Sequence, residues 1–418
     1  MAETPNKLIN PVWQVKERHQ PLMPDGFAII SVAISIVAMI FLGQLYILIF
    51  YALWLPRIYY KKNWTIKPTK AIIFPAIIII YSLASTIWSV HTGMTLRAGL
   101  QFASVICCSL IISRIVRINA FIKGVTLGMC IALIIVLIST GSIHTETALV
   151  GSLGSKNQVG ANAQIGLYCA IICGFIFKKY WAKILMALPA MFLCAGCLIL
   201  SKSATSNVSF FAMIIVSGIA YIIAKLSRQF RILAFITAIF LAAIITSIGM
   251  SINVEEAGLK ATGKDITLTG RTFLWEEGIK IGMKNPILGS GLGAFWIPGT
   301  PEAEKIWFKF NIFHKSGFHF HNLFINIFVE LGIIGVILWG LMYMFLGIKS
   351  FRYLLKNGGG IESIFYIGIA SMYFVRSISE SDTGGPYGVG PLLFFYIVFR
   401  VASKNISRYS TPLTEQKI

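Results

Sequence analysis

The feature that most constrains the fold is a succession of long apolar segments separated by short basic loops. The apolar segments centre on residues 27–56, 71–90, 96–113, 118–139, 157–177, 184–201, 205–223, 232–250, 321–346, 361–378 and 390–402. Many of them approach the roughly 20 residues that an α-helix needs to cross the hydrocarbon core of a bilayer. The pattern therefore predicts an all-α polytopic membrane protein.

Composition agrees with this fold class and excludes several others. The chain is 56% apolar and 12% charged, and its mean hydropathy is +0.77. A net charge of +20 would suit nucleic-acid binding, but the basic residues are spread through short loops, as in a membrane protein. All seven cysteines lie inside apolar segments, so we expect reduced thiols and no disulfide or zinc framework. No cleaved signal peptide is predicted in residues 1–26.

The charge of the loops predicts the topology. The segment 27–56 is interrupted by Gly43 and Gln44, and we divide it into two short helices that meet there. With this division the basic loops fall on one side of the membrane, at 57–70, 114–117, 178–183, 225–231 and 349–356. Lys and Arg concentrate in cytoplasmic loops. The sequence therefore predicts about twelve transmembrane helices with both chain ends in the cytoplasm.

One hydrophilic segment, 251–320, is much longer than the other connections. The predicted regions are a cytoplasmic tail (1–26), transmembrane helices 1–9 (27–250), a periplasmic loop (251–320), transmembrane helices 10–12 (321–402) and a second cytoplasmic tail (403–418). From Thr272 to Lys284 the loop has the pattern of an amphipathic helix lying on the outer leaflet. The glycine-rich stretch that follows, at 289–293, is by itself weak evidence for phosphate binding.

The helix predicted to begin at 321 starts with an imidazole and an amide, His321 and Asn322. If both lie in the first turn, unpaired N–H groups and the positive helix end favour an anion and a neutral imidazole. Such an imidazole is a candidate general base. Glu330 lies about half a turn out of phase, so it is not the carboxylate that orients His321. Small residues on the face shared with His321, Gly332 and Gly335, are expected to admit another helix.

Several basic residues fall on the predicted periplasmic side, most of them at helix ends: Arg97, Lys156, Lys202, Arg271 and Arg376. At one depth they would line a cationic bowl around His321 that binds phosphate or pyrophosphate. Four of them also have a structural interpretation. Arg97 and Lys202 suit contacts with lipid headgroups, Arg376 suits an interhelical salt bridge with Glu380, and Arg271 suits plain solvation.

A metal centre is not predicted. His314, His319 and His321 lie near Glu302 and Glu304 in the sequence, but they match no established ligand spacing. No Ser-His-Asp or Cys-His arrangement, Walker loop or dinucleotide fingerprint is apparent. We therefore expect no metal and no cofactor.

Motifs in a fixed order resemble those of one family. His321 and Asn322, followed by Glu330 and Gly332, match a signature of His-Asn, apolar spacing and Glu-x-Gly. Other stretches resemble an exopolysaccharide polymerase branch: 154–160 (GSKNQVG), 200–205 (LSKSAT), 269–275 (TGRTFLW), 285–295 (NPILGSGLGAF) and 375–380 (VRSISE). The chain thus resembles the O-antigen ligase and polysaccharide polymerase superfamily of bacterial inner membranes.

This resemblance implies a metal-independent, inverting transfer of a glycan from undecaprenyl pyrophosphate to an acceptor hydroxyl at the periplasmic face. It implies that Arg271 holds the leaving pyrophosphate and that His321 activates the hydroxyl. The further residues predicted to bind substrate are Arg97, Lys156, Asn157, Lys202, Asn322, Arg376 and Glu380. Many relatives carry Arg or Lys where this chain has Ala204. Lys202, Arg97 or Arg376 would then supply the second cation.

The implied partners are the lipid-linked donor, the bilayer, a chain-length regulator and export proteins, but no nucleic acid. The acceptor is a second repeat unit in a polymerase or the lipid A core in a ligase, and the 154–160 and 269–275 motifs favour the polymerase. A lipid-linked oligosaccharide flippase, another transporter or a scaffold are the alternatives. Transporters place ionisable groups at mid-membrane, whereas here the polar residues gather at one face.

Overall fold

The computed structural model describes residues 24–60, 70–139, 148–226, 229–230, 271–315 and 317–402. Within these ranges every regular element is a helix, and there is no strand. The predicted helix at 232–250, the first part of the hydrophilic segment (251–270) and most of both predicted tails lie outside the described residues.

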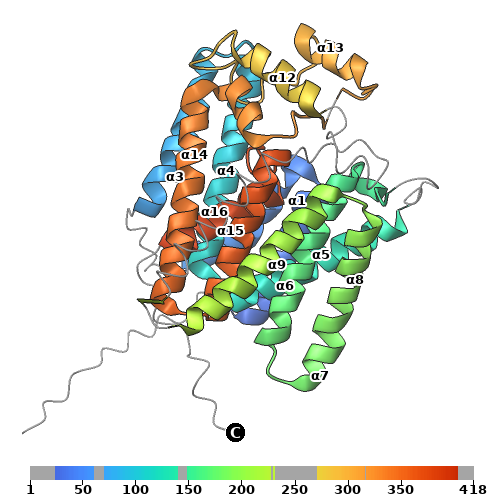
Figure 1. The fold of residues 1–418 in the computed structure, drawn as a ribbon, viewed down its shortest axis with the longest axis vertical. Coiled ribbons are helices and arrows are strands. Elements are labelled where there is room, and N and C mark those ends of the chain that lie inside the picture. The colour runs from blue at the N-terminus through green and yellow to red at the C-terminus, as the bar shows by residue number, and fades with distance from the viewer. Residues whose placement is uncertain are drawn as a thin grey trace, which may run out of the picture.

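The helices form one bundle (Figure 1). Its main elements are α1 (Asp25–Phe41), α2 (Tyr46–Tyr60), α3 (Lys70–Ala84), α4 (Thr92–Ile115), α5 (Ile118–Ile138), α6 (Lys156–Ile176), α7 (Tyr180–Ala182), α8 (Leu188–Leu200), α9 (Ala204–Lys225), α14 (Leu323–Asn357), α15 (Ile361–Ser379) and α16 (Val389–Ala402). Among the described residues, seven helices are long and apolar enough to cross a membrane, and four shorter apolar ones accompany them. The chain is therefore an all-α, multi-pass membrane protein.

The break predicted near Gly43 is present. The helix α1 ends at Phe41, a short 3-10 turn follows at Gly43–Leu45, and α2 begins at Tyr46. Gly43 has φ of 53°, a left-handed conformation that glycine adopts without steric cost.

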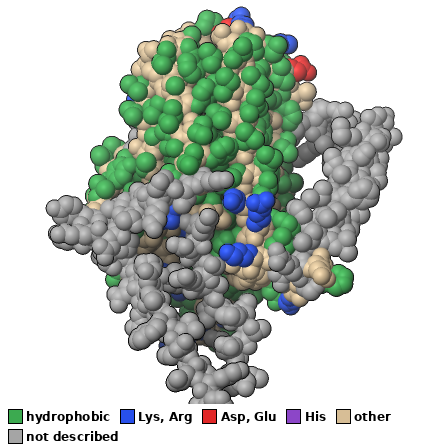
Figure 2. All heavy atoms as spheres, turned by 90° about the vertical axis from the view of Figure 1, so that its left-hand side faces the viewer, with side chains coloured by type: hydrophobic (Ala, Val, Ile, Leu, Met, Phe, Trp, Pro, Cys, Tyr) green, Lys and Arg blue, Asp and Glu red, His purple; other side chains and the backbone are tan. Residues whose placement is uncertain are grey.

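The core of the bundle surrounds α16. Its residues from Leu392 to Phe399 are all buried, which explains why this helix is apolar on every side. Phe121 of α5 stacks on Tyr396 with ring centroids 3.7 Å apart, and Trp339 of α14 packs beside Phe394. The face shown in Figure 2 is also largely apolar, with Lys and Arg side chains in its lower half and a few charged side chains at its top edge.

Two short helices cover one end of the bundle, α12 (Arg271–Gly282) and α13 (Pro301–Lys309) (Figure 1). They enclose a small second core that includes Leu274, Phe295, Trp307 and Phe320. The amphipathic helix predicted from Thr272 to Lys284 corresponds to α12. Gly278 and Gly282 place its inner face directly against the side chains of α14. It is therefore packed on protein along that face instead of lying only on lipid.

The helix α14 is not the continuous rod predicted from residue 321 to 346. Gly332 has φ of 64° and interrupts it. The rings of Phe324 and Tyr343 lie with centroids 5.9 Å apart, although 19 residues of straight helix would separate them by about 28 Å. A Cβ on Gly335 would also lie 3.1 Å from the side chain of Ile327. The two halves therefore fold back toward each other, so that the start of α14 reaches down beside its own middle.

The glycine-rich segment supplies the hydrogen bonds that this reversal removes from the helix. The N–H groups of Ser290 and Gly291 donate to the carbonyls of Val329 and Glu330, at 3.0 and 2.8 Å. In return the N–H of Ile333 donates to the carbonyl of Pro286 at 2.8 Å. Backbone groups freed by a helix break in a membrane protein must find such partners.

The same contacts bear on two features noted in the sequence. The Gly293 N–H of the glycine-rich stretch donates to the Glu330 carboxylate at 3.0 Å, so this donor is occupied by a protein group. A Cβ on Gly332 would lie 2.2 Å from the carbonyl oxygen of Ile287. The small residue at 332 therefore admits a loop, where the sequence suggested a helix. These contacts also give Glu330 and Gly332 a structural reason to occur together.

Candidate functional site

His321 precedes α14, so the prediction that it lies in the first turn is wrong. It adopts a left-handed conformation with φ of 50°. Asn322 is the N-cap residue, and its side-chain oxygen accepts hydrogen bonds from the N–H groups of Phe324 and Ile325, at 3.0 and 3.1 Å. Its amide nitrogen donates to the carbonyl of Ile378 at 3.0 Å. Asn322 was predicted to bind substrate, but both its amide oxygen and its amide nitrogen form hydrogen bonds that fix the start of α14.

Glu380 joins the candidate residues of four separate segments. It is the C-cap of α15, and its side chain is only 3% exposed. One carboxylate oxygen, Oε1, accepts from Asn157 Nδ2 and from Arg271 Nη2, each at 2.9 Å. The other, Oε2, lies 3.3 Å from His321 Nδ1 and 3.6 Å from His319 Nε2. We call these five side chains the Glu380 cluster.

Residues at the start of α9 orient members of the cluster. Ser203 caps α9, and its hydroxyl donates to Asn157 Oδ1 at 3.0 Å, which orients the amide so that its nitrogen faces Glu380. Thr205 Oγ1 lies 3.4 Å from Arg271 Nη1. Residues that orient a functional side chain in this way fix its geometry without touching a ligand.

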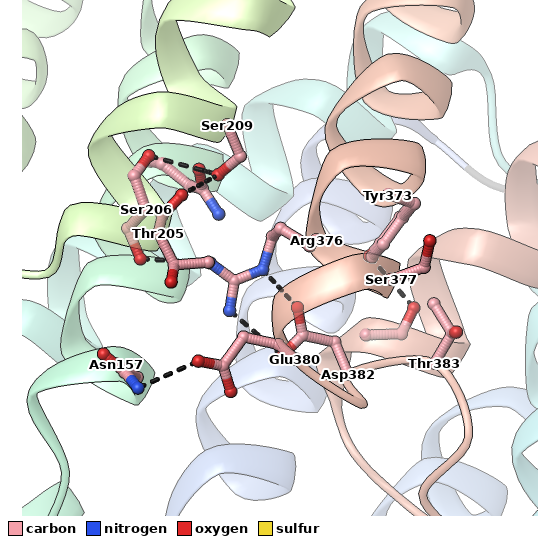
Figure 3. Close-up of polar contacts among 12 residues, drawn as sticks. Asn157, Thr205, Ser206, Ser209, Tyr373, Arg376, Ser377, Glu380, Asp382 and Thr383 are labelled. Atoms are coloured by element: carbon pink, nitrogen blue, oxygen red, sulfur yellow. Dashed lines mark hydrogen bonds and ion pairs between the residues drawn. The ribbon is translucent and has the colours of Figure 1, made fainter. Parts of the chain in front are cut away.

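Arg376 belongs to a different ion pair from the predicted one. Its Nε and Nη2 contact the two carboxylate oxygens of Asp382, and its Nη1 donates to Ser206 Oγ at 3.0 Å (Figure 3). The predicted interhelical pair of Arg376 with Glu380 is therefore wrong. Its carboxylate partner is Asp382, which lies six residues further along the chain, in the connection to α16. With a side chain 2% exposed, Arg376 ties α15 to α9 and to the loop that follows Glu380.

The cluster holds Glu380 as a carboxylate and His319 as a neutral imidazole. Burial raises the pKa of Glu380, but the hydrogen bond with His321 and the charge of Arg376 outweigh burial, and the net pKa is lowered. Burial is also the largest effect at His319, where it lowers the pKa to about 3. The Nδ1 of His319 accepts the His321 N–H at 3.0 Å. A neutral His319 therefore carries its proton on Nε2, toward Glu380.

Three side chains from two segments that are far apart in the sequence form a set with metal-ligand atoms close together. His319, His321 and Glu380 each offer one ligand atom, and these atoms lie within 4.8 Å of one another. The Glu302 and Glu304 that prompted the metal question pair instead with Lys284 and Lys315. Arg271 already contacts Glu380 at 2.9 Å, and a fixed positive charge there opposes a bound cation.

The other predicted cations are not among the five side chains of the Glu380 cluster. Lys156 precedes Asn157 in the first turn of α6, and Lys202 precedes Ser203 with φ of 46°. Both are exposed and flank the cluster along the chain. Arg97 is exposed on α4, in the turn that also carries Ala98, against which the glycine-rich segment packs. Arg97 thus lies beside that segment, and Arg376 is committed to Asp382.

Sequence reasoning did not assign a site role to His319 or a partner role to Asp382. The signal for His319 was its position two residues before His321, since alternate residues of an extended segment can turn toward a common neighbour. Their rings do meet, with centroids 4.2 Å apart. For Asp382 the signal was its place six residues beyond Arg376, just past Glu380, which lies one turn away and was the other reasonable choice.

Fold and site together define a class: a multi-pass helical membrane protein with a polar, mixed-charge site at one end of its bundle. Comparison with known proteins gives the family. The profile of the family described as O-antigen ligase matches residues 189–340. The chain is also 31% identical over 402 residues to the exopolysaccharide production protein ExoQ of Rhizobium meliloti (strain 1021), covering 94% of this chain and 92% of that protein.

The chain therefore belongs to the O-antigen ligase and polymerase superfamily, which confirms the resemblance drawn from its motifs. It is a membrane enzyme of the O-antigen and exopolysaccharide class. The matched 189–340 range includes α12, both imidazoles of the Glu380 cluster and the reversal in α14.

Proposed function

We propose that this protein is a metal-independent, inverting glycosyltransferase of the bacterial inner membrane. It polymerises exopolysaccharide or O-antigen repeat units that are carried on undecaprenyl pyrophosphate, at the periplasmic face. The observation that carries the proposal is the Glu380 cluster, in which one buried carboxylate is shared by an arginine and an imidazole from opposite sides.

The proposed base is His321, oriented by Glu380. When Nδ1 of His321 carries the proton, it donates to Glu380 Oε2, and Nε2 is left as a proton acceptor. Nε2 then takes the proton of the acceptor hydroxyl as its oxygen forms a bond to the anomeric carbon. The bond from that carbon to the pyrophosphate oxygen breaks on the opposite face, which inverts the configuration.

The proposed electrophilic group is Arg271. Its side chain is 14% exposed, and its described contacts are to Glu380 and Thr205. A guanidinium has five N–H donors, so it can contact Glu380 and a phosphate together. Because the leaving pyrophosphate gains negative charge as the glycosidic bond breaks, such a contact strengthens in the transition state.

For the second cation, the geometry favours Lys202 or Lys156 over the other candidates. Both flank the residues that hold Asn157 against Glu380. Arg376 is buried against Asp382, and Arg97 lies beside the glycine-rich segment.

The name of the Rhizobium relative, an exopolysaccharide production protein, supports the polymerase assignment. The family description, O-antigen ligase, supports the second candidate, a ligase that transfers the glycan to the lipid A core. For the polymerase, the further partners we propose are a chain-length regulator and export proteins.

The decisive variant is His321→Ala. We expect it to insert and fold normally but to form no glycan product, because the proton acceptor is lost. The measurement is polymer formed from purified protein and lipid-linked donor, with a matched His314→Ala control that should retain activity. A normal amount of polymer from His321→Ala would contradict the proposed mechanism.

Transfer should also proceed without a divalent metal, since protein cations are available to the pyrophosphate. We expect purified protein with excess chelator to form product at an unchanged rate. Loss of activity that only added metal restores would show that His319, His321 and Glu380 hold an ion.

A further inference from the structure

A groove of about 820 Å³ runs between α14 and α15. Most of its lining is apolar, and two glycines of α14, Gly340 and Gly347, make room for it. Ile378 is 61% exposed and Met344 is 52% exposed, so the groove opens outward along the apolar surface of the bundle. Its volume falls within the roughly 300–1,000 Å³ that is usual for ligand sites.

The upper end of the groove adjoins the Glu380 cluster. Phe324 and Ile378 line that end. They lie on either side of the hydrogen bond from Asn322 Nδ2 to the Ile378 carbonyl, which joins α14 to α15. Asn322 follows His321, and Ile378 precedes Glu380 by two residues. The reversal at Gly332 therefore brings the start of α14 to the point where groove and cluster meet.

The lower end of the groove lies near Leu355 and Arg352. From Gly340 to Leu355 the groove follows about 22 Å of helix, a large part of the roughly 30 Å hydrocarbon thickness. Among the lining residues, only Arg352 is charged at neutral pH, and it lies at the end away from the cluster. A long uncharged chain that enters from the cluster end would thus meet apolar side chains along nearly all of its path.

We propose that this groove holds the isoprenoid chain of the lipid-linked donor, with its pyrophosphate beside Arg271. The inference rests on the proposed function and adds the place where the lipid is recognised. A groove whose upper end lies next to the segments that carry His321 and Glu380 would let the donor stay in the membrane while its anomeric carbon faces His321. A membrane phospholipid would use the same groove in the opposite sense, with its headgroup at Arg352.

The test fills the groove without disturbing the helix packing. A Cβ at Gly340 meets nothing within 4 Å, so Gly340→Leu extends into the groove. Gly218 of α9 is also open at 4 Å and lies outside the groove lining, so Gly218→Leu is the matched control. We expect Gly340→Leu to raise KM for the undecaprenyl donor on the order of tenfold. Gly218→Leu should leave KM for the same donor unchanged.

Direct binding separates this inference from the proposed reaction. Undecaprenyl pyrophosphate without glycan, carrying a photoreactive group partway along its chain, should crosslink to α14 between Met344 and Leu355, and less in Gly340→Leu. Such crosslinking in a protein that transfers no glycan would leave the groove assignment standing and defeat the proposed function. Crosslinks to other helices, or equal KM effects of Gly340→Leu and Gly218→Leu, would overturn the groove assignment. So would a photoreactive phospholipid that labels the groove equally well and loses its labelling in Arg352→Gln.

Discussion

Two arginine–carboxylate pairs lie close together at the end of α15, and they differ in how completely they are closed. Arg376 uses three nitrogens on Asp382 and Ser206, and its side chain is 2% exposed. Arg271 reaches Glu380 with a single nitrogen, and its side chain is 14% exposed. Glu380 is in turn shared with Asn157 and two imidazoles. A closed pair fastens helices, whereas a shared and partly open pair leaves donors for a ligand.

The closed pair positions the open one. Glu380 lies between Arg376 and Asp382 in the chain, at the point where α15 ends. By binding Asp382 on one side and Ser206 of α9 on the other, Arg376 fixes the turn that presents the Glu380 carboxylate. The same α9 terminus holds Asn157 through Ser203.

The largest expected effect is a loss of folding stability when the closed Arg376–Asp382 pair is broken. Asp382→Asn leaves a buried guanidinium without its counter-charge, which typically costs about 3–5 kcal/mol. We expect a large fall in thermal stability and in the yield of folded protein. Because both partners can be replaced together at much lower cost, Arg376→Met with Asp382→Leu should recover most of the loss.

The matched change in the open pair is Glu380→Gln. It should cost less stability, since its neighbours keep a neutral acceptor and Arg271 retains access to solvent. It should lower kcat on the order of 10²-fold to 10³-fold, because His321 is no longer held as a base. Equal loss of stability in Glu380→Gln and Asp382→Asn would remove the distinction between the pairs.

The sequence predicts the fold class and most helices, because apolar segments of membrane length carry a strong periodic signal. It also predicts that Asn157, Arg271, His321 and Glu380 belong to one site, through their motifs. The reversal at Gly332 was missed because both halves of α14 are apolar, and nothing in their composition distinguishes a rod from a folded pair.

The sequence also could not predict which carboxylate pairs with which arginine. Glu380 and Asp382 both lie within reach of Arg376 along the chain, and only the packing of α6, α9 and α12 decides between them. His321 was placed inside a helix because Asn322 is equally suited to a first turn and to an N-cap. The left-handed turn at His321 is accompanied by a hydrogen bond from its N–H to the His319 side chain, which no helical pattern predicts.

A smaller effect is expected from Arg271→Lys, which keeps the charge of the open pair and removes its second donor group. Lysine cannot contact Glu380 and a phosphate with two fixed N–H groups as guanidinium can. If Arg271 acts on the leaving group in the transition state, kcat should fall roughly tenfold to thirtyfold, by more than KM rises. Initial rates over a range of donor concentrations separate the two constants.

The outcome that contradicts this role is a change in KM alone, which would make Arg271 a recruiting residue. Lys280→Arg on the exposed side of α12 is the control, because its charge is conserved away from the cluster. Labelling of a single cysteine at position 271 only from the cytoplasmic side would contradict the proposed periplasmic site as well.

The smallest expected effect concerns His319, which links the open pair to pH. Its pKa is lowered to about 3 in the folded protein, against about 6.5 in an unfolded chain. The unfolded state therefore binds the extra proton, so this contribution to stability is complete above pH 6.5 and is lost as pH falls. The carboxyl of Glu380, whose pKa is also lowered, follows only below about pH 4.5. With 29% of the His319 side chain exposed, we expect roughly 1 kcal/mol of lost stability between pH 7.5 and 5.5.

His319→Asn retains an acceptor for the His321 N–H but does not titrate, so its melting temperature should fall less over the same interval. Parallel curves for wild type and His319→Asn would show that burial of this imidazole does not couple the site to pH.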